Sequence, residues 1–101
     1  MQTLYIIYDP KNEKVLYKTY DETKARDKMT TYIKKESKPI VIRINKNEIK
    51  SNSFYILYDI THSKVISIKK YPYEILNYIK NTKKYCLNNY QVIEVNLRKE
   101  S

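Results

Sequence analysis

Residues 4–18 read LYIIYDPKNEKVLYK, and residues 54–68 read FYILYDITHSKVISI. The two stretches are nearly the same segment written twice, fifty positions apart. Identical residues occupy these matched positions: Tyr5/Tyr55, Ile6/Ile56, Tyr8/Tyr58, Asp9/Asp59, Lys14/Lys64 and Val15/Val65. A chain of 101 residues that repeats itself at half its length is typical of a duplicated supersecondary unit. The repeat therefore sets the architecture before any other signal is considered.

The similarity continues beyond this block, with shifts in spacing. Residues 32–34 (YIK) reappear as residues 78–80, and residues 41–44 (VIRI) align with residues 92–95 (VIEV). Loops and helix ends accept such changes in length at low cost in free energy. Each copy is therefore predicted to consist of a hairpin, a helix and a strand.

The first copy carries the local signals of these elements. Residues 4–9 and 15–20 are rich in aliphatic and tyrosine residues, as strands are, and the polar residues 10–13 form a turn between them. Asp21 is the predicted helix N-cap, and Pro39 prevents the helix from continuing. The predicted buried stripe of the helix is Ala25, Met29, Tyr32 and Ile33. In the strand over residues 40–44, alternation turns one face inward with Ile40, Ile42 and Ile44, and the other outward with Val41 and Arg43.

The second copy follows the same order. Pro72 fits the first position of its helix. The predicted buried stripe is Ile75, Leu76 and Ile79, extended by Tyr85 and Leu87. The last strand runs over residues 91–97, with Ile93, Val95 and Leu97 directed inward.

These patterns predict an α+β fold: one domain over residues 1–101, built of two ββαβ repeats, 1–50 and 51–101. We expect six mainly antiparallel strands, two helices and internal pseudo-twofold symmetry. A crossover that skips the first hairpin strand gives the local strand order 2-1-3 in each half. Two ways of joining the halves remain open at this point: one continuous sheet, or two sheets that face each other.

Glycine is absent from the chain, which excludes enzymes that use a glycine-rich nucleotide-binding loop or a nucleophile elbow. A P-loop, a dinucleotide-binding fingerprint and a nucleophile elbow all need glycine for tight turns or close backbone approach. Positive φ angles are then expected at asparagines: Asn12, Asn45, Asn47, Asn52, Asn88 or Asn89.

Other classes of protein are excluded by what the chain lacks. No apolar run of membrane-spanning length occurs, and residues 1–9 read as a strand and not as a signal peptide. The single cysteine, Cys86, cannot form an internal disulfide and is compatible with a cytoplasmic protein.

Candidate catalytic residues are few. His62 is the only histidine, and it stands in the turn position that Asn12 occupies in the first copy. Asp9 and Asp59 could approach each other and hold a divalent metal, but aspartate before a hairpin turn usually bonds its own backbone. Cys86 reads as a small packing residue. We therefore expect no enzyme, no cofactor and no metal site.

The charge balance is the main functional signal. Twenty basic side chains against eleven acidic ones give a net charge of +9, shared about evenly between the two copies. Such a protein attracts polyanions, and the phosphate backbone of nucleic acid is the obvious one. Only three of the basic residues are arginines, so recognition of particular bases is weakly supported. An AT-rich genome would also produce a surplus of lysine and tyrosine without selection for a ligand.

Twelve tyrosines add a second signal. The first strand of each copy is apolar on both faces, and its helix can cover only one of them. Exposed tyrosines among lysines would form a stacking platform for single-stranded nucleic acid. The predicted contact residues are Tyr5, Tyr17, Lys18, Arg43, Tyr55, Lys69, Lys70, Lys83 and Lys84. The same surface would also suit a protein partner or a second copy of the chain.

Two functions therefore remain open. The first is a non-enzymatic module that binds nucleic acid. The second is an accessory protein of a phage or mobile element that binds and inhibits a host or defence protein, such as a nuclease, through an acidic surface of that protein. A structural subunit of a larger assembly is a third hypothesis. The copies differ at Tyr17/Ser67, Lys18/Ile68 and Arg43/Glu94, so any function is expected to lie in these differences.

Overall fold

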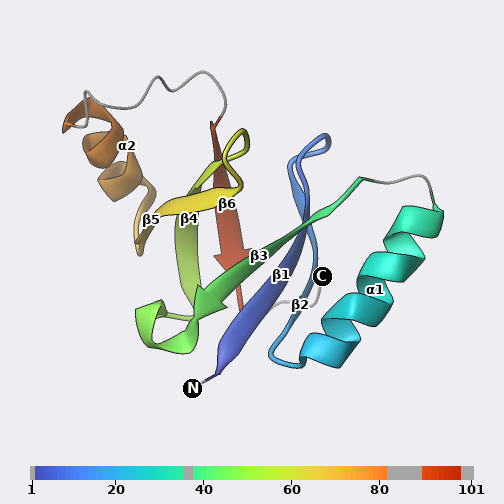
Figure 1. Cartoon of the computed structure of the whole chain (residues 1–101). Helices are drawn as coiled ribbons and strands as arrows, with labels where there is room; N and C mark the ends of the chain where they lie inside the picture. The colour runs from blue at the N-terminus through green and yellow to red at the C-terminus, as the bar shows by residue number, and fades with distance from the viewer. Residues whose placement is uncertain (1, 36–37, 82–89, 99–101) are drawn as a thin grey trace.

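The computed structural model describes residues 2–35, 38–81 and 90–98. Two three-stranded antiparallel sheets face each other, and one helix covers the outer side of each sheet (Figure 1). The predicted α+β fold with six strands and two helices is confirmed. Of the two ways of joining the halves, the chain adopts the pair of facing sheets.

The first sheet contains β1 (Thr3–Asp9), β2 (Lys14–Thr19) and β3 (Ile40–Asn45), in the order β2-β1-β3. Helix α1 (Glu22–Lys34) joins β2 to β3 across its outer side. A short 3-10 helix, η1 (Lys46–Glu48), then leads into the second half. The predicted order 2-1-3 is therefore confirmed in the first copy.

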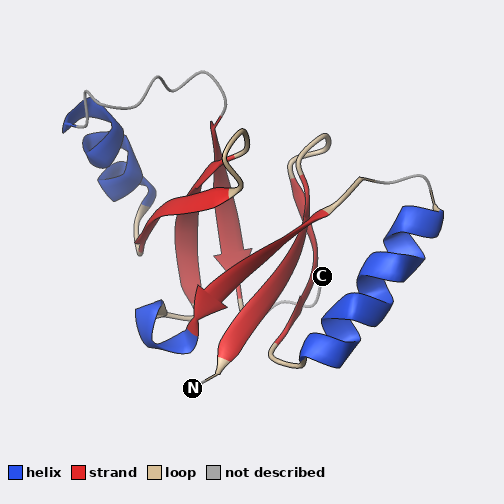
Figure 2. Ribbon diagram, viewed as in Figure 1, coloured by secondary structure: helices blue, strands red, loops and turns tan. Residues whose placement is uncertain are grey.

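The second sheet repeats this arrangement. It contains β4 (Ser53–Asp59), β5 (Lys64–Lys69) and β6 (Tyr90–Asn96), in the order β5-β4-β6, and α2 (Pro72–Asn81) lies on its outer side. The hairpin turns of the two sheets lie together at one end of the molecule, and η1 lies at the other end (Figure 2).

Alternation along the central strands explains why they are apolar on both faces. In β1, Ile6 faces the second sheet and Ile7 faces α1, and neither is exposed at all. A central strand covered by a sheet on one side and by a helix on the other must be apolar throughout.

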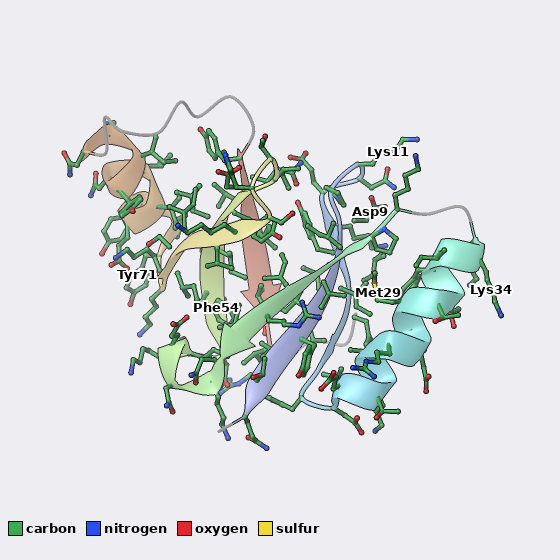
Figure 3. The ribbon with its side chains drawn as sticks, viewed as in Figure 1. Asp9, Lys11, Met29, Lys34, Phe54 and Tyr71 are labelled. Carbon is green, nitrogen blue, oxygen red and sulfur yellow. The ribbon has the colours of Figure 1, made fainter. Side chains whose placement is uncertain are left out.

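The core between the sheets draws on both copies. Phe54 lies between the sheets in Figure 3, with the partly buried Val15 and Ile68 packed against the same cluster. The buried members are Leu4, Ile6, Tyr8, Ile42, Ile44, Phe54, Ile56, Tyr58, Ile93 and Val95. The inward faces predicted for the third strand of each copy are confirmed by this cluster, and Leu97 packs at its margin.

The helices bury less than their sequence stripes predict. Ala25 and Ile75 are buried, but Ile33 is 58% exposed and Leu76 is 59% exposed. Each helix lies on one flat sheet surface, so a step of about 100° per residue carries Leu76 away from the surface that Ile75 contacts. The predicted burial of Ile33 and Leu76 is therefore wrong, and Tyr85 and Leu87 lie outside the described residues.

The hairpin turns correct another prediction. Within the described ranges, the residues with positive φ are Glu13 (53°) and Ser63 (50°), and not asparagines. They occupy equivalent turn positions, so the hairpin geometry that both copies share imposes this conformation whatever side chain is present. Asn88 and Asn89 lie outside the described residues.

The predicted helix starts are confirmed. The Asp21 carboxylate accepts hydrogen bonds from the backbone N–H groups of Thr23 at 2.9 Å and Lys24 at 3.3 Å, as an N-cap does. Pro72 is the first residue of α2, and the backbone N–H of Tyr71 donates to the carboxylate of Glu74 at 3.2 Å.

Candidate nucleic-acid interface

Helix α1 covers β1 and β2 and leaves the outer face of β3 open beside it. A groove of about 340 Å³ results between α1 and β3, and we call it the Arg43 groove. Met29 extends from the helix toward the sheet, as Figure 3 shows. The lining residues are Tyr5, Glu22, Ala25, Arg26, Met29, Thr30, Val41 and Arg43.

The floor of the groove combines an aromatic ring with a cation. Tyr5 and Arg43 are paired in register across β1 and β3, so both side chains lie on the outer face of the sheet. The guanidinium carbon of Arg43 lies 5.9 Å from the centroid of the Tyr5 ring. This is a cation–π contact, which holds the cation beside a half-buried ring while Arg43 itself is exposed.

The groove carries a net positive charge. Its one carboxylate, Glu22, forms an ion pair with Arg26 one helical turn further along. Arg43 forms no ion pair with any described residue. Among the charged side chains of the groove, the Arg43 guanidinium is therefore the one available to bind an anionic ligand.

Tyr17 and Lys18 point to opposite faces of β2. Tyr17 pairs with Ile7 and lies on the outer face, where the Lys28 ammonium from α1 is 5.2 Å from its ring centroid. Lys18 pairs with Ile6 and therefore faces the second sheet, where burial lowers its pKa. Tyr17 and Lys18, both predicted contact residues, therefore lie on opposite faces of β2 and cannot contribute to the same outer surface.

The predicted residues of the second copy lie on the other side of the molecule. Tyr55 is on the outer face of the second sheet, paired with Lys69 of β5 and with Glu94 of β6. Tyr5 and Tyr55 are therefore separated by both sheets and cannot form one platform. Lys83 and Lys84 lie outside the described residues.

Two further tyrosines surround the start of α2. The rings of Tyr71 and Tyr73 are stacked, with centroids 5.5 Å apart and planes at 12°. Lys70 lies 5.3 Å from the Tyr71 centroid, and Lys69 lies 6.0 Å from the Tyr78 centroid. Both predicted lysines thus contact aromatic rings, but on the face opposite to Arg43.

The outer face of the second sheet differs in chemistry from the Arg43 groove. Glu94 takes the place of Arg43, and the register pairs it with Tyr55 as Arg43 is paired with Tyr5. Leu76 aligns with Thr30, and Val92 at the other side is 44% exposed. The second copy therefore carries a carboxylate and an exposed leucine at the two positions where the Arg43 groove has a cation and a threonine.

The turn residues take the structural role that the sequence favoured. Asp9 accepts hydrogen bonds from the backbone N–H of Lys11 at 3.0 Å and from the side-chain amide of Asn12 at 2.7 Å. The Asn12 amide is the main reason why the pKa of Asp9 lies below its ordinary value of 3.8. In the second copy, His62 Nδ1 lies 2.7 Å from the Asp59 carboxylate. No group of three metal-ligating side chains occurs in the described ranges.

The sequence did not predict the roles of Tyr20, Lys28 and Lys46, which form cation–π contacts at the surface. The Lys46 ammonium lies 5.7 Å from the centroid of the Tyr20 ring. The available signal was that residues 46–52 join the two copies and have no counterpart in the repeat.

None of the helices in the described ranges has the length and apolar character needed to cross a membrane. Comparison of the chain with protein-family models, curated proteins and solved structures gave no match.

Proposed function

We propose that this chain is a small non-enzymatic protein of the cytoplasm that binds single-stranded nucleic acid through the Arg43 groove. The observation that carries the proposal is the pairing of Tyr5 and Arg43 on the floor of an open groove, in a chain of net charge +9. A ring that can stack on a base and a cation that can meet a phosphate are the two contacts that single strands need.

The groove suits an unpaired strand better than a duplex. One arginine and one half-buried tyrosine give too few contacts to read base pairs, whereas base stacking is tolerant of sequence. The other cations of the same face, including Lys28 above Tyr17, add attraction along the phosphate backbone. Affinity is therefore expected to fall steeply as salt is raised.

The test is fluorescence anisotropy with a labelled oligothymidine of about ten nucleotides, since an OB-fold-sized site spans about 4–16 nucleotides. Arg43→Ala and Tyr5→Leu should each weaken binding roughly tenfold, as loss of a stacked or charge-assisted contact of about 1–3 kcal/mol implies. Lys64→Ala is the matched control, because it removes one charge from the exposed hairpin of the second copy.

An equal loss of oligothymidine affinity in Lys64→Ala and Arg43→Ala would show that only net charge matters. It would refute the assignment of the Arg43 groove as the binding site. Absence of binding even at low salt would refute the function itself.

A protein partner is the second candidate, and the outer face of the second sheet favours it. Tyr73 and Leu76 are each 59% exposed, and Val92 is 44% exposed, which is unusual for large apolar side chains near an edge strand. We propose in this case an accessory protein of a phage or mobile element that occupies a host or defence protein. A partner recovered after nuclease treatment should be lost with Leu76→Asp and kept with Arg43→Ala; the reverse pattern would exclude this face.

A further inference from the structure

A second hollow, of about 350 Å³, lies beside η1. Figure 2 shows η1 at the end of the molecule opposite the hairpin turns. We call it the Tyr20 hollow. It is built from the residue that follows β2, the segment that joins the two copies, and the residue that follows β6. The Arg43 groove shares no lining residue with it. The repeat does not generate this hollow, because residues 46–52 occur once in the chain.

One wall of the hollow is an aromatic ring with a fixed cation beside it. Tyr20 is 42% exposed, and the Lys46 ammonium lies 5.7 Å from its ring centroid. The same ammonium donates a hydrogen bond to the side-chain oxygen of Gln2 at 2.9 Å, and the Lys46 backbone N–H donates to the Gln2 carbonyl at 3.0 Å. The cation is therefore held in position before any ligand arrives.

The second lysine of the hollow is available to an anion. Lys50 is exposed, and it forms no ion pair with a described residue. No carboxylate lines the hollow. Arg98, which lies just beyond β6, adds positive charge beside the hollow. When the amide oxygen of Asn52 is turned toward Arg98, it accepts hydrogen bonds from the Arg98 Nη2 at 3.2 Å and Nε at 3.1 Å. The local potential is therefore positive.

The floor of the hollow is apolar and anchored. Ile49 and Leu97 pack against the core between the sheets. The Leu97 backbone N–H donates to the carbonyl of Asn52 at 2.7 Å, which ties the joining segment to the end of β6. An apolar floor beside an exposed ring suits a flat ring system, and the two lysines suit an anion attached to it.

We propose that the Tyr20 hollow binds a nucleotide, with its phosphate on Lys46 and Lys50 and its base against Tyr20 and the apolar floor. The volume lies at the lower end of the range of small-ligand sites, roughly 300–1,000 Å³, which fits one nucleotide. The ligand is either a free nucleotide or the 5′-phosphorylated end of a strand, because both present the same chemistry. The proposal does not depend on the Arg43 groove, since each site has its own ring and its own cation.

The experiment is a titration of the ¹⁵N-labelled chain with AMP, followed by two-dimensional NMR. The amides of residues 46–52 should shift, with a Kd of about 1 mM, as expected for an open site with few contacts. Lys50→Ala should weaken binding about tenfold, because the phosphate then loses one of its two charge-assisted hydrogen bonds. Tyr20→Leu should weaken it comparably and Tyr20→Phe should not, because the ring and not the hydroxyl is required.

Matched controls separate this site from the other and from net charge. Lys64→Ala should leave the AMP affinity read at residues 46–52 within about twofold of the unaltered chain. Arg43→Ala should weaken the binding of oligothymidine at the Arg43 groove. Inorganic phosphate should shift the same amides more weakly, because it lacks the base.

Two strands of the same sequence distinguish the sources. If the strand with a 5′-phosphate binds at these amides more tightly than both AMP and the strand without the phosphate, the ligand is a strand end. If AMP binds at least as tightly as the phosphorylated strand, the ligand is a free nucleotide. The proposal is overturned if AMP shifts none of these amides at about 10 mM, ten times the expected Kd, or if Lys64→Ala weakens binding as much as Lys50→Ala.

Discussion

The hydroxyl group of Tyr8 donates a hydrogen bond to the side-chain oxygen of Gln91, which joins the first strand of the chain to the last. The amide nitrogen of Gln91 in turn donates to the carbonyl of Pro10 at 3.0 Å. Gln91 is the register partner of Tyr58 in the second sheet, and Ile40 is the register partner of Tyr8 in the first. Ile40 therefore occupies the position equivalent to Gln91, and its side chain cannot accept a hydrogen bond from Tyr58. This link between the sheets is therefore made once and breaks the pseudo-twofold symmetry.

Removing the Tyr8 hydroxyl should destabilise the whole sandwich. Tyr8→Phe leaves the Gln91 oxygen partly buried without its donor, which costs about 1–2 kcal/mol of the free energy of unfolding. Tyr73→Phe is the control, because Tyr73 is 59% exposed, and it should change this free energy by less than about 0.5 kcal/mol. Urea denaturation measures both variants, and an unchanged midpoint for Tyr8→Phe would contradict the role of the bond.

The same residue predicts a dependence on alkaline pH. Burial, followed by the charges of Glu13 and Asp9, raises the pKa of Tyr8 from 10.0 to about 12. The folded state therefore keeps Tyr8 neutral where the unfolded chain ionises it, so this contribution to stability is complete below pH 10 and declines between pH 10 and about 12. The advantage of the unaltered chain over Tyr8→Phe should shrink across this interval. A constant difference between the two denaturation curves would contradict the raised pKa.

Adjacent residues of α2 test where the helix meets its sheet. Ile75 is 1% exposed and Leu76 is 59% exposed. Ile75→Ala should lower the free energy of unfolding by about 2–5 kcal/mol, because it leaves a cavity, whereas Leu76→Ala should stay within about 0.5 kcal/mol. Chemical denaturation of both variants gives the comparison, and equal losses would mean that Leu76 is also buried in solution.

A single glycine in this glycine-free chain should be stabilising if it replaces Glu13. The φ of Glu13 is 53°, a conformation that costs a side chain with a Cβ about 1–2 kcal/mol and glycine much less. After the entropic cost of glycine, Glu13→Gly should raise the free energy of unfolding by about 0.5 kcal/mol. Lys11→Gly, in the same turn but without positive φ, should lower it. Thermal denaturation shows whether each variant is stabilised or destabilised. A lower Tm for Glu13→Gly would contradict the inference that the backbone at Glu13 is strained.

The repeat predicted the strands, the helices and their order, because residues that recur in both copies mark the positions that the shared packing requires. It could not choose between one sheet and two, since strands apolar on both faces, such as the one containing Ile6 and Ile7, suit either arrangement. Alternation along the strands placed Arg43 outward correctly. It could not find the contact of Lys46 with Tyr20, because that contact joins the residue after β2 to η1, and the sequence of η1 is not repeated in the second copy.

The difference between Arg43 and Glu94 can be tested by exchange. Glu94→Arg would place a guanidinium beside Tyr55, in the register position that Arg43 holds beside Tyr5. If a cation paired with a tyrosine is what binds single strands, this change should create a second weak site and tighten oligothymidine binding beyond the effect of charge. Glu94→Gln removes the negative charge without adding a cation. Comparison of Lys64→Ala with the unaltered chain gives the effect of one distant charge. Anisotropy at two salt concentrations should rank Glu94→Arg well above Glu94→Gln, by roughly fivefold for a contact of about 1 kcal/mol. Equal affinities for the two variants would mean that a cation beside Tyr55 is not sufficient for binding on the second face. The exposed Leu76 in place of Thr30 would then be the remaining difference in chemistry.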